Sequence, residues 1–139
     1  IFSDISKIPS INKPIIVEFE GSFSDNEIYF NQIDQYLRPP FRADLILVMH
    51  SELVYPLISV LQNKKIRVPQ DIALISMEDG TGFELMFSPV TCLKRPFSGL
   101  ALKAANMIWS EVKNAGKGKF KRQVNIMPSL EVRNSCGSL

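Results

Sequence analysis

The sequence predicts an α/β fold built around a mainly parallel β-sheet, and two observations carry this prediction. Short apolar segments rich in β-branched residues alternate at least three times with segments whose apolar residues recur at helical spacing. Strands and helices that alternate in this way pair into a parallel sheet through right-handed crossovers. At 139 residues, the chain is long enough for one domain with a substantial core.

The first part of the chain is expected to contain two strands and one helix. A β-branched strand covers residues 15–19, and a helix over residues 26–37 follows a loop in which Ser24 or Asp25 supplies the cap. Two consecutive prolines stop this helix. The continuous apolar run at residues 45–49 is typical of a strand that is buried on both faces.

A second helix and a third strand come next. The helix is predicted over residues 52–63, and the strand over residues 72–75 is again apolar throughout. A long loop over residues 78–89 begins with a glycine-containing turn signal. The residues expected to face inward from the helix are Val54, Leu57, Ile58 and Leu61.

The last third of the chain is expected to hold a short strand at residues 89–93, a long helix over residues 97–114, and strands at 123–127 and 130–133. The long helix carries two apolar stripes. One stripe is expected to cover the sheet, and the other has no assigned partner. The stripes consist of Phe97, Ala101, Ala104, Ile108 and Val112, and of Leu102, Ala105 and Trp109.

Composition excludes several classes of protein. A net charge of +2 is too balanced for a protein that coats nucleic acid. The chain has one histidine, and Cys92 and Cys136 fit no metal or redox spacing, so we expect no metal and no cofactor. No apolar run approaches the roughly eighteen residues that span a bilayer. We therefore expect a cytoplasmic protein without membrane contact and, since it lacks an initiator methionine, a fragment of a longer chain.

The stretch from Ile66 to Asp79 points to a binding site. It leads through a buried strand and places Glu78 and Asp79 directly after it. His50 follows the preceding strand in the same way. Ligands of open α/β sheets bind outside the carboxyl ends of the strands, so these groups indicate a site for a polar small molecule that is held rather than transformed. A turn histidine bonded to backbone is an equal alternative for His50.

Four segments resemble the effector-binding domain of the lac-repressor/gal-repressor family of transcription regulators. They are DLILVMHSELV at residues 44–54, IRVPQDIALISMED at 66–79, SPVTCLKRPF at 88–97 and MPSLEVRNS at 127–135. The match to this family runs from about residue 15 to 137. The resemblance implies a three-layer α/β sandwich with a mainly parallel, Rossmann-like sheet, of the periplasmic-binding-protein-like type I.

In that family, two lobes close on a small molecule and an N-terminal helix-turn-helix binds operator DNA. The resemblance implies that residues 1–139 are the C-terminal lobe plus a crossing segment at 90–117, without the helix-turn-helix and most of the first lobe. The intact protein would be a homodimer that senses a small-molecule effector, a sugar or a related polar metabolite. Operator DNA would be contacted only through the missing N-terminal domain.

The resemblance also assigns roles to single residues. Glu78 would accept hydrogen bonds from ligand hydroxyl groups, Phe23 would stack on a sugar face, and Ser22 is a weaker candidate beside it. This chain has His50 and Glu78 where the family usually has Asn and Asp, which reshapes the pocket. We expect Phe23, His50 and Glu78 to surround one groove. Core packing is an equal alternative for Phe23.

Two further residues near the predicted site are given structural roles. Asp79 is expected to be a solvated loop acid. Arg133 matches the closing arginine of the family and is expected to be an internal salt-bridge or hydrogen-bonding partner rather than a ligand contact.

The loop after Glu78 is unusually apolar for a connector and should bury against something. In relatives, this loop and the start of the second helix form the dimer interface. The alternative is burial within the same chain. The residues assigned to the interface are Tyr55, Phe83, Leu85, Met86 and Phe87.

Two other function classes compete with a non-catalytic sensor. A small Rossmann-like enzyme acting on nucleotides or sugar phosphates would need a phosphate-binding glycine loop or a convergent acid/base set. Gly80–Gly82 and Gly116–Gly118 do not lie between a strand and a helix at the required spacing. The lobe of a periplasmic sugar-binding protein is the other alternative. The resemblance favours the regulator.

Overall fold

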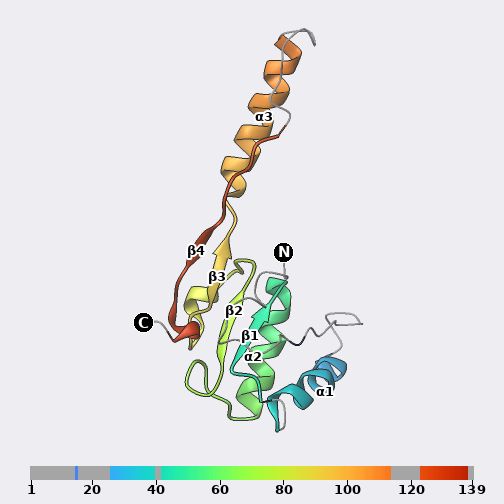
Figure 1. The fold of residues 1–139 in the computed structure, drawn as a ribbon, viewed down its shortest axis with the longest axis vertical. Helices are drawn as coiled ribbons and strands as arrows, with labels where there is room; N and C mark the ends of the chain where they lie inside the picture. The colour runs from blue at the N-terminus through green and yellow to red at the C-terminus, as the bar shows by residue number, and fades with distance from the viewer. Residues whose placement is uncertain (1–14, 16–25, 40–41, 114–122, 138–139) are drawn as a thin grey trace.

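A four-stranded sheet forms the centre of the protein (Figure 1). The computed structural model describes residues 15, 26–39, 42–113 and 123–137. The strands follow the order β1-β2-β3-β4; the first three are parallel and β4 runs antiparallel to β3. Their bounds are β1 Leu45–Val48, β2 Ala73–Ser76, β3 Thr91–Lys94 and β4 Ser129–Glu131.

Three α-helices accompany this sheet. They are α1 Asn26–Leu37, α2 Val54–Asn63 and α3 Phe97–Lys113. Short 3₁₀ turns lie at Ser51–Leu53, which leads directly into α2, at Phe83–Leu85 and at Asn134–Cys136. No helix in the described part of the chain combines the length and apolarity required to cross a bilayer.

The core lies between α2 and the sheet. Apolar residues recur in α2 at a spacing that places them on one face, which packs on the strands. Val54, Leu57, Ile58 and Leu61 all contribute to this face: three are fully buried and Ile58 packs at its margin. The inward face predicted from the sequence is therefore confirmed. The buried strand and loop residues opposite α2 include Val48, Leu74, Phe83 and Val90.

Helix α1 has the predicted bounds and packs against the same core through Ile33 and Leu37. An ion pair between Asp34 and Lys64 also ties α1 to the end of α2. This contact with Lys64, together with Arg38, lowers the pKa of the Asp34 carboxyl below its ordinary value. Helix α1 is thus held to α2 by apolar packing and by charge.

The prediction that residues 45–49 are buried on both faces is wrong. Leu45 and Leu47 are 49% and 40% exposed, whereas Val48 is buried. Alternate residues of a strand point to opposite faces, and α2 covers only one of them. Among the described residues, no element covers the Leu45 and Leu47 face.

The prediction of a strand at residues 123–127 is also wrong, and β4 is shorter than the predicted 130–133 segment. The register pairs Ser129 with Lys94, the last residue of β3. Because β3 and β4 are antiparallel, residues before Ser129 lie beyond the end of β3, where Pro96 and α3 begin. In the described part of the chain, these residues have no strand to pair with.

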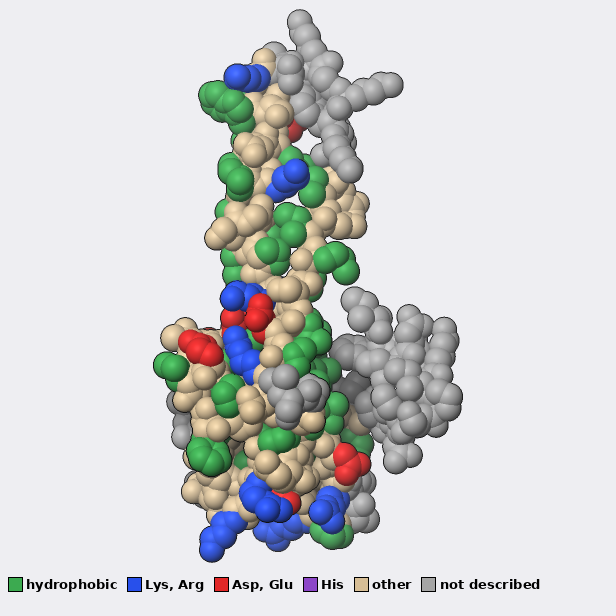
Figure 2. Space-filling view, turned by 90° about the vertical axis from the view of Figure 1, so that its left-hand side faces the viewer, with side chains coloured by type: hydrophobic (Ala, Val, Ile, Leu, Met, Phe, Trp, Pro, Cys, Tyr) green, Lys and Arg blue, Asp and Glu red, His purple; other side chains and the backbone are tan. Residues whose placement is uncertain are grey.

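Helix α3 stands out from the rest of the molecule (Figure 1). It continues past the end of β3 instead of folding back onto the sheet, and none of its residues is buried. Figure 2 shows hydrophobic side chains along this projection. The prediction that one stripe of this helix covers the sheet is therefore wrong. Both apolar stripes are open in the structure, and exposed residues include Leu102, Ile108, Trp109 and Val112.

Candidate functional site

Glu78 connects the segments that follow three parallel strands. It lies just after β2, and its Oε2 accepts a hydrogen bond of 3.2 Å from the backbone N–H of Ser51, which follows β1. Its Oε1 forms an ion pair with Nη2 of Arg95, which follows β3. Parallel strands end on one edge of a sheet, so residues that follow them meet there. This edge is called the rim below.

His50 joins Glu78 at the rim. Its Nδ1 lies 3.9 Å from Oε2 of Glu78, and its side chain is 67% exposed. The predicted proximity of His50 and Glu78 is confirmed. Phe23 and Ser22, the other two predicted ligand contacts, lie outside the described residues.

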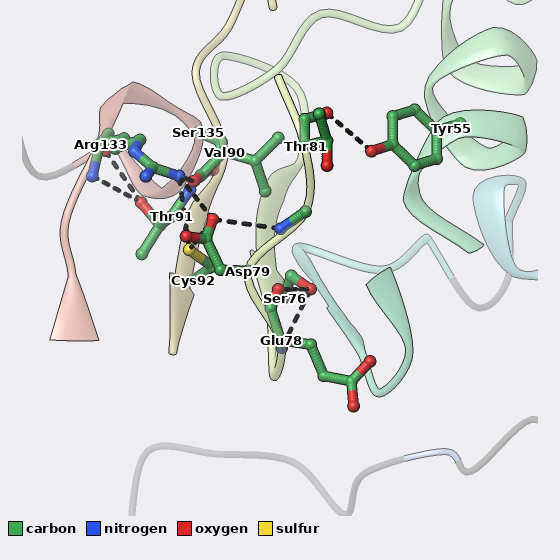
Figure 3. Close-up of polar contacts among 11 residues, drawn as sticks. Tyr55, Ser76, Glu78, Asp79, Thr81, Val90, Thr91, Cys92, Arg133 and Ser135 are labelled. Atoms are coloured by element: carbon green, nitrogen blue, oxygen red, sulfur yellow. Dashed lines mark hydrogen bonds and ion pairs between the residues drawn. The ribbon is translucent and has the colours of Figure 1, made fainter. Parts of the chain in front are cut away.

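The turn after β2 fixes the position of Glu78. The fully buried hydroxyl of Ser76 donates to the carbonyl oxygen of Glu78 at 2.7 Å and accepts from its N–H at 3.3 Å. This pair of bonds holds the backbone at the strand end. Figure 3 shows that the Glu78 carboxylate then extends away from its sequence neighbour Asp79.

Asp79 points instead into a polar cluster behind the rim (Figure 3). Its Oδ1 accepts from the Cys92 thiol at 3.2 Å and lies 3.6 Å from Nη1 of Arg133. Arg133 Nη1 also donates to the carbonyl oxygen of Val90 at 2.7 Å. Asp79 is an exposed loop residue, as predicted, and its carboxylate is also held by these internal donors. The internal role predicted for Arg133 is confirmed.

The Cys92 thiol belongs to the same cluster and is fully buried. Burial, with the neighbouring Asp79 carboxylate, raises the pKa of Cys92 to about 11. A thiolate is the reactive form of cysteine, so this side chain stays protonated near neutral pH. Its position between Asp79 and Arg133 is structural.

The rim offers groups that bind rather than groups that react. Glu78 supplies acceptor oxygens, while Arg95 and the exposed His50 supply N–H donors. No group of three or more metal-ligating side chains occurs in the described ranges. The arrangement suits a polar small molecule that is held by several hydrogen bonds.

Arg95 is the residue of the rim that our sequence analysis missed. It is a charged side chain two residues after a predicted strand of a parallel set. His50 and Glu78 were noticed because they follow the other two strands. The same rule, applied to residues 89–93, would have found Arg95.

The apolar loop after Glu78 divides into a buried part and an exposed part. Phe83 is fully buried, with its ring 5.8 Å from that of Tyr55, so its assignment to an interface surface is wrong. A loop has no periodicity that reveals which side chains turn inward. Leu85 and Phe87 are 84% and 100% exposed. Met86 packs at the margin of the core.

A groove of about 880 Å³ lies beside this loop. One wall comes from α2, with Tyr55, Ile58 and Leu61, and another comes from Met86 and Phe87. The hydroxyl of Tyr55 donates to the carbonyl oxygen of Thr81 at 2.8 Å, which ties the start of α2 to the loop (Figure 3). Three of the five residues assigned to the interface, Tyr55, Met86 and Phe87, therefore line this groove.

Comparisons with known proteins agree with this geometry. Residues 15–136 match the family described as "Periplasmic binding protein-like domain". The HTH-type transcriptional repressor PurR of Actinobacillus pleuropneumoniae serotype 3 (strain JL03) is 27% identical in an alignment of 131 residues that covers 92% of this chain and 38% of that protein.

Two solved structures have a similar fold. Transcription regulator CcpA of Lactococcus lactis has a TM-score of 0.70 at 15% identity, covering 95% of this chain and 46% of that chain. A LacI family transcriptional regulator from Lactobacillus casei, with bound sucrose, has a TM-score of 0.63 at 21% identity, covering 84% and 41%. The chain thus spans less than half the length of these relatives.

The parallel sheet with a polar rim at its strand ends defines an α/β domain of the ligand-binding type. The chain belongs to the family of periplasmic binding protein-like domains. Its similarity to the PurR repressor agrees with the resemblance to the lac-repressor/gal-repressor regulators, and the two solved regulators share its fold.

Proposed function

We propose that this chain is the effector-sensing and dimerisation lobe of a bacterial transcription regulator of the lac-repressor type. The observation that carries the proposal is the rim, where Glu78 meets Ser51, Arg95 and His50 at the ends of three parallel strands. The similar regulator from Lactobacillus casei holds sucrose in one structure and glucose in another. The effector is a sugar or related polar metabolite, and the protein is cytoplasmic and non-catalytic.

The direction of α3 supports a second lobe opposite the rim. Strand β3 carries the chain past Arg95 and Pro96 into a helix whose apolar stripes are exposed. An apolar surface of this kind needs a partner layer in water. The crossing segment at residues 90–117 would supply this helix to the first lobe, so that a cleft lies between the two lobes with the rim on one side.

Regulation would follow from a shift between two lobe arrangements. An effector stabilises the arrangement to which it binds more tightly, and this arrangement spaces the DNA-binding domains differently. The coupling requires that contacts at the rim differ between the two arrangements. Arg95 lies at the start of the crossing segment, so a ligand beside Glu78 also lies beside the connection between the lobes.

The test uses the complete gene product in a thermal-shift screen of sugars and nucleobases, followed by operator binding with each hit. Glu78→Ala and His50→Ala should each reduce the stabilisation by a hit, because the hydrogen bonds at the rim are lost. Glu84→Ala, which removes an exposed acid in the 3₁₀ turn Phe83–Leu85, is the matched control. Stabilisation that survives both rim substitutions unchanged would refute the site, and turnover of a hit would refute the non-catalytic assignment.

A further inference from the structure

We propose that Arg95 selects an effector that carries an anionic group, a carboxylate or a phosphoryl group, in addition to hydroxyl groups. This inference rests on the proposed sensing function and specifies the chemistry of its ligand. Glu78 already makes hydrogen bonds within the protein. Each of its two carboxylate oxygens has a donor from the protein, Ser51 N–H on Oε2 and Arg95 on Oε1.

The donors of Arg95 are far from saturated. A guanidinium has five N–H groups, and Arg95 uses Nη2 on Glu78. Among the described residues, Glu78 is its only acidic partner. The side chain is 47% exposed, so most of its donor capacity is open to the rim.

Two contacts keep the guanidinium at the rim. Glu78 holds one end, and the ring of Phe97 lies beneath it, with the Arg95 Cζ atom 5.1 Å from the ring centroid. The backbone on either side is held as well, because the Phe97 N–H donates to the Arg95 carbonyl oxygen at 2.9 Å. A guanidinium held in this way loses little further freedom when it binds a ligand.

The open hydrogen-bond donors at the rim favour an anion. Glu78 and Arg95 carry opposite charges and pair with each other, so the groups left open are the remaining N–H groups of Arg95 and the exposed ring of His50. The unused groups are thus mostly donors. A carboxylate or phosphoryl group accepts paired N–H bonds from a guanidinium, whereas a sugar hydroxyl accepts only single bonds. Figure 2 shows acidic and basic side chains side by side where α3 leaves the body.

Glu78 retains a role toward the rest of the same ligand. A carboxylate has about four lone-pair positions, and the protein donors occupy two of them. The others can accept from ligand hydroxyl groups. The anion on Arg95 and the hydroxyl groups on Glu78 then fix one orientation of a small polyhydroxylated acid or phosphate ester.

The test measures binding of matched probes to the complete gene product by calorimetry at constant ionic strength. The probes are glucose, gluconate and glucose 6-phosphate, then ribose and ribose 5-phosphate, and inorganic phosphate alone. At least one anionic probe should bind about 10-fold or more tightly than its neutral counterpart. Arg95→Gln should abolish that preference, so that the anionic probe and its neutral counterpart bind with similar affinity. Arg95→Lys keeps the positive charge but loses the paired N–H donors of the guanidinium, so it should retain part of the preference for the anionic probe.

The matched control is Lys94→Gln, which removes a neighbouring exposed positive charge and should keep the preference. If Arg95→Gln does not fold, the preference of Arg95→Lys for anionic over neutral probes still tests the proposal. The proposal is overturned if neutral probes bind as tightly as anionic ones, if Arg95→Gln keeps the preference, or if no anionic probe binds at about 10 mM. If only neutral sugars bind, the anion proposal fails but the proposed sensing function still holds. If no polar molecule binds or alters operator affinity, both proposals are wrong.

Discussion

The hydroxyl of Ser135 donates a hydrogen bond of 2.6 Å to the carbonyl oxygen of Leu74, 61 residues earlier in the chain. The hydroxyl oxygen of Ser135 in turn accepts a bond of 2.8 Å from the N–H of Thr91. Strand β3 begins at Thr91, so the backbone pairing between β2 and β3 stops at this point. Ser135 therefore completes the sheet with its side chain and attaches the end of the chain to the central strands.

Ser135→Ala should destabilise the protein by roughly 2–4 kcal/mol. The serine is fully buried, so its removal leaves a donor on Thr91 and an acceptor on Leu74 without partners and without water. Urea unfolding measures the change. Ser129→Ala, at an exposed position of β4, is the control and should change stability by less than about 0.5 kcal/mol. Equal effects of the two substitutions would contradict this account of Ser135.

Gly80→Ala should destabilise the protein by about 1–3 kcal/mol. A Cβ atom at residue 80 would lie only 2.6 Å from Cζ of Phe83. Phe83 is fully buried and closely surrounded, so its ring cannot move away cheaply. The free energy of unfolding from urea titration is again the measurement.

The same glycine-to-alanine change at residue 99 should instead stabilise the protein. The nearest atom to a Cβ at residue 99 is Cβ of Pro96 at 3.8 Å, an ordinary contact. Gly99 lies in α3, where alanine is the better helix former, so stability should rise by up to about 1 kcal/mol. If both alanines destabilise alike, close packing on Phe83 is not the cause at residue 80.

Periodicity explains which parts of this structure could be predicted from the sequence. The bounds of α1 could be predicted from a capping residue and from the two prolines that stop the helix, and the inward face of α2 from the spacing of its apolar residues. The meeting of His50 and Glu78 follows from a rule of topology, because each follows a parallel strand. These features depend on local pattern and on the order of elements along the chain.

The sequence could not predict which part of the protein packs against a given apolar surface. The stripes of α3 show that it needs a partner, but the pattern is the same whether the partner is this sheet or another lobe. Phe83 and Phe87 lie in one loop, have the same side chain and have opposite environments, fully buried and fully exposed. The amino-acid composition of the loop does not indicate which of these two phenylalanines is buried.

The Cys92 thiol should make stability fall as the pH rises from about 9 to about 11. In the folded protein, burial raises the pKa of Cys92 from its ordinary value of 9.0 to about 11. Between these values the unfolded chain has lost the thiol proton and the folded chain has kept it. The unfolded state therefore binds fewer protons, and its free energy falls relative to that of the folded state.

Urea unfolding at a series of pH values, compared between the wild type and Cys92→Ala, isolates this contribution. Lysine and tyrosine titrate in the same range in both proteins, so only the difference between the two curves is diagnostic. The difference should stay constant below pH 9 and shrink above it. Parallel curves up to pH 11 would show that the folded thiol has an ordinary pKa.

Leu85 and Phe87 should hold two copies of the protein together through the groove beside them. Both side chains are almost fully exposed, and the groove offers an apolar surface lined by Tyr55, Ile58 and Met86. In a two-fold dimer, the protruding side chains of each copy can enter the groove of the other. Burial of exposed apolar side chains contributes about 1.5–3 kcal/mol for each residue.

Leu85→Glu combined with Phe87→Glu should therefore convert the complete protein from dimer to monomer in sedimentation velocity, with its circular dichroism unchanged. The two carboxylates would have to be buried without partners, which costs more than the dimer gains. Phe83→Glu is not a useful substitution here, because Phe83 lies in the core and its change would unfold the chain. Met127→Glu, at an exposed apolar residue outside the groove lining, is the matched control and should remain dimeric. A dimer of undiminished affinity in the double variant would mean that the groove faces solvent and that Leu85 and Phe87 are exposed for another reason.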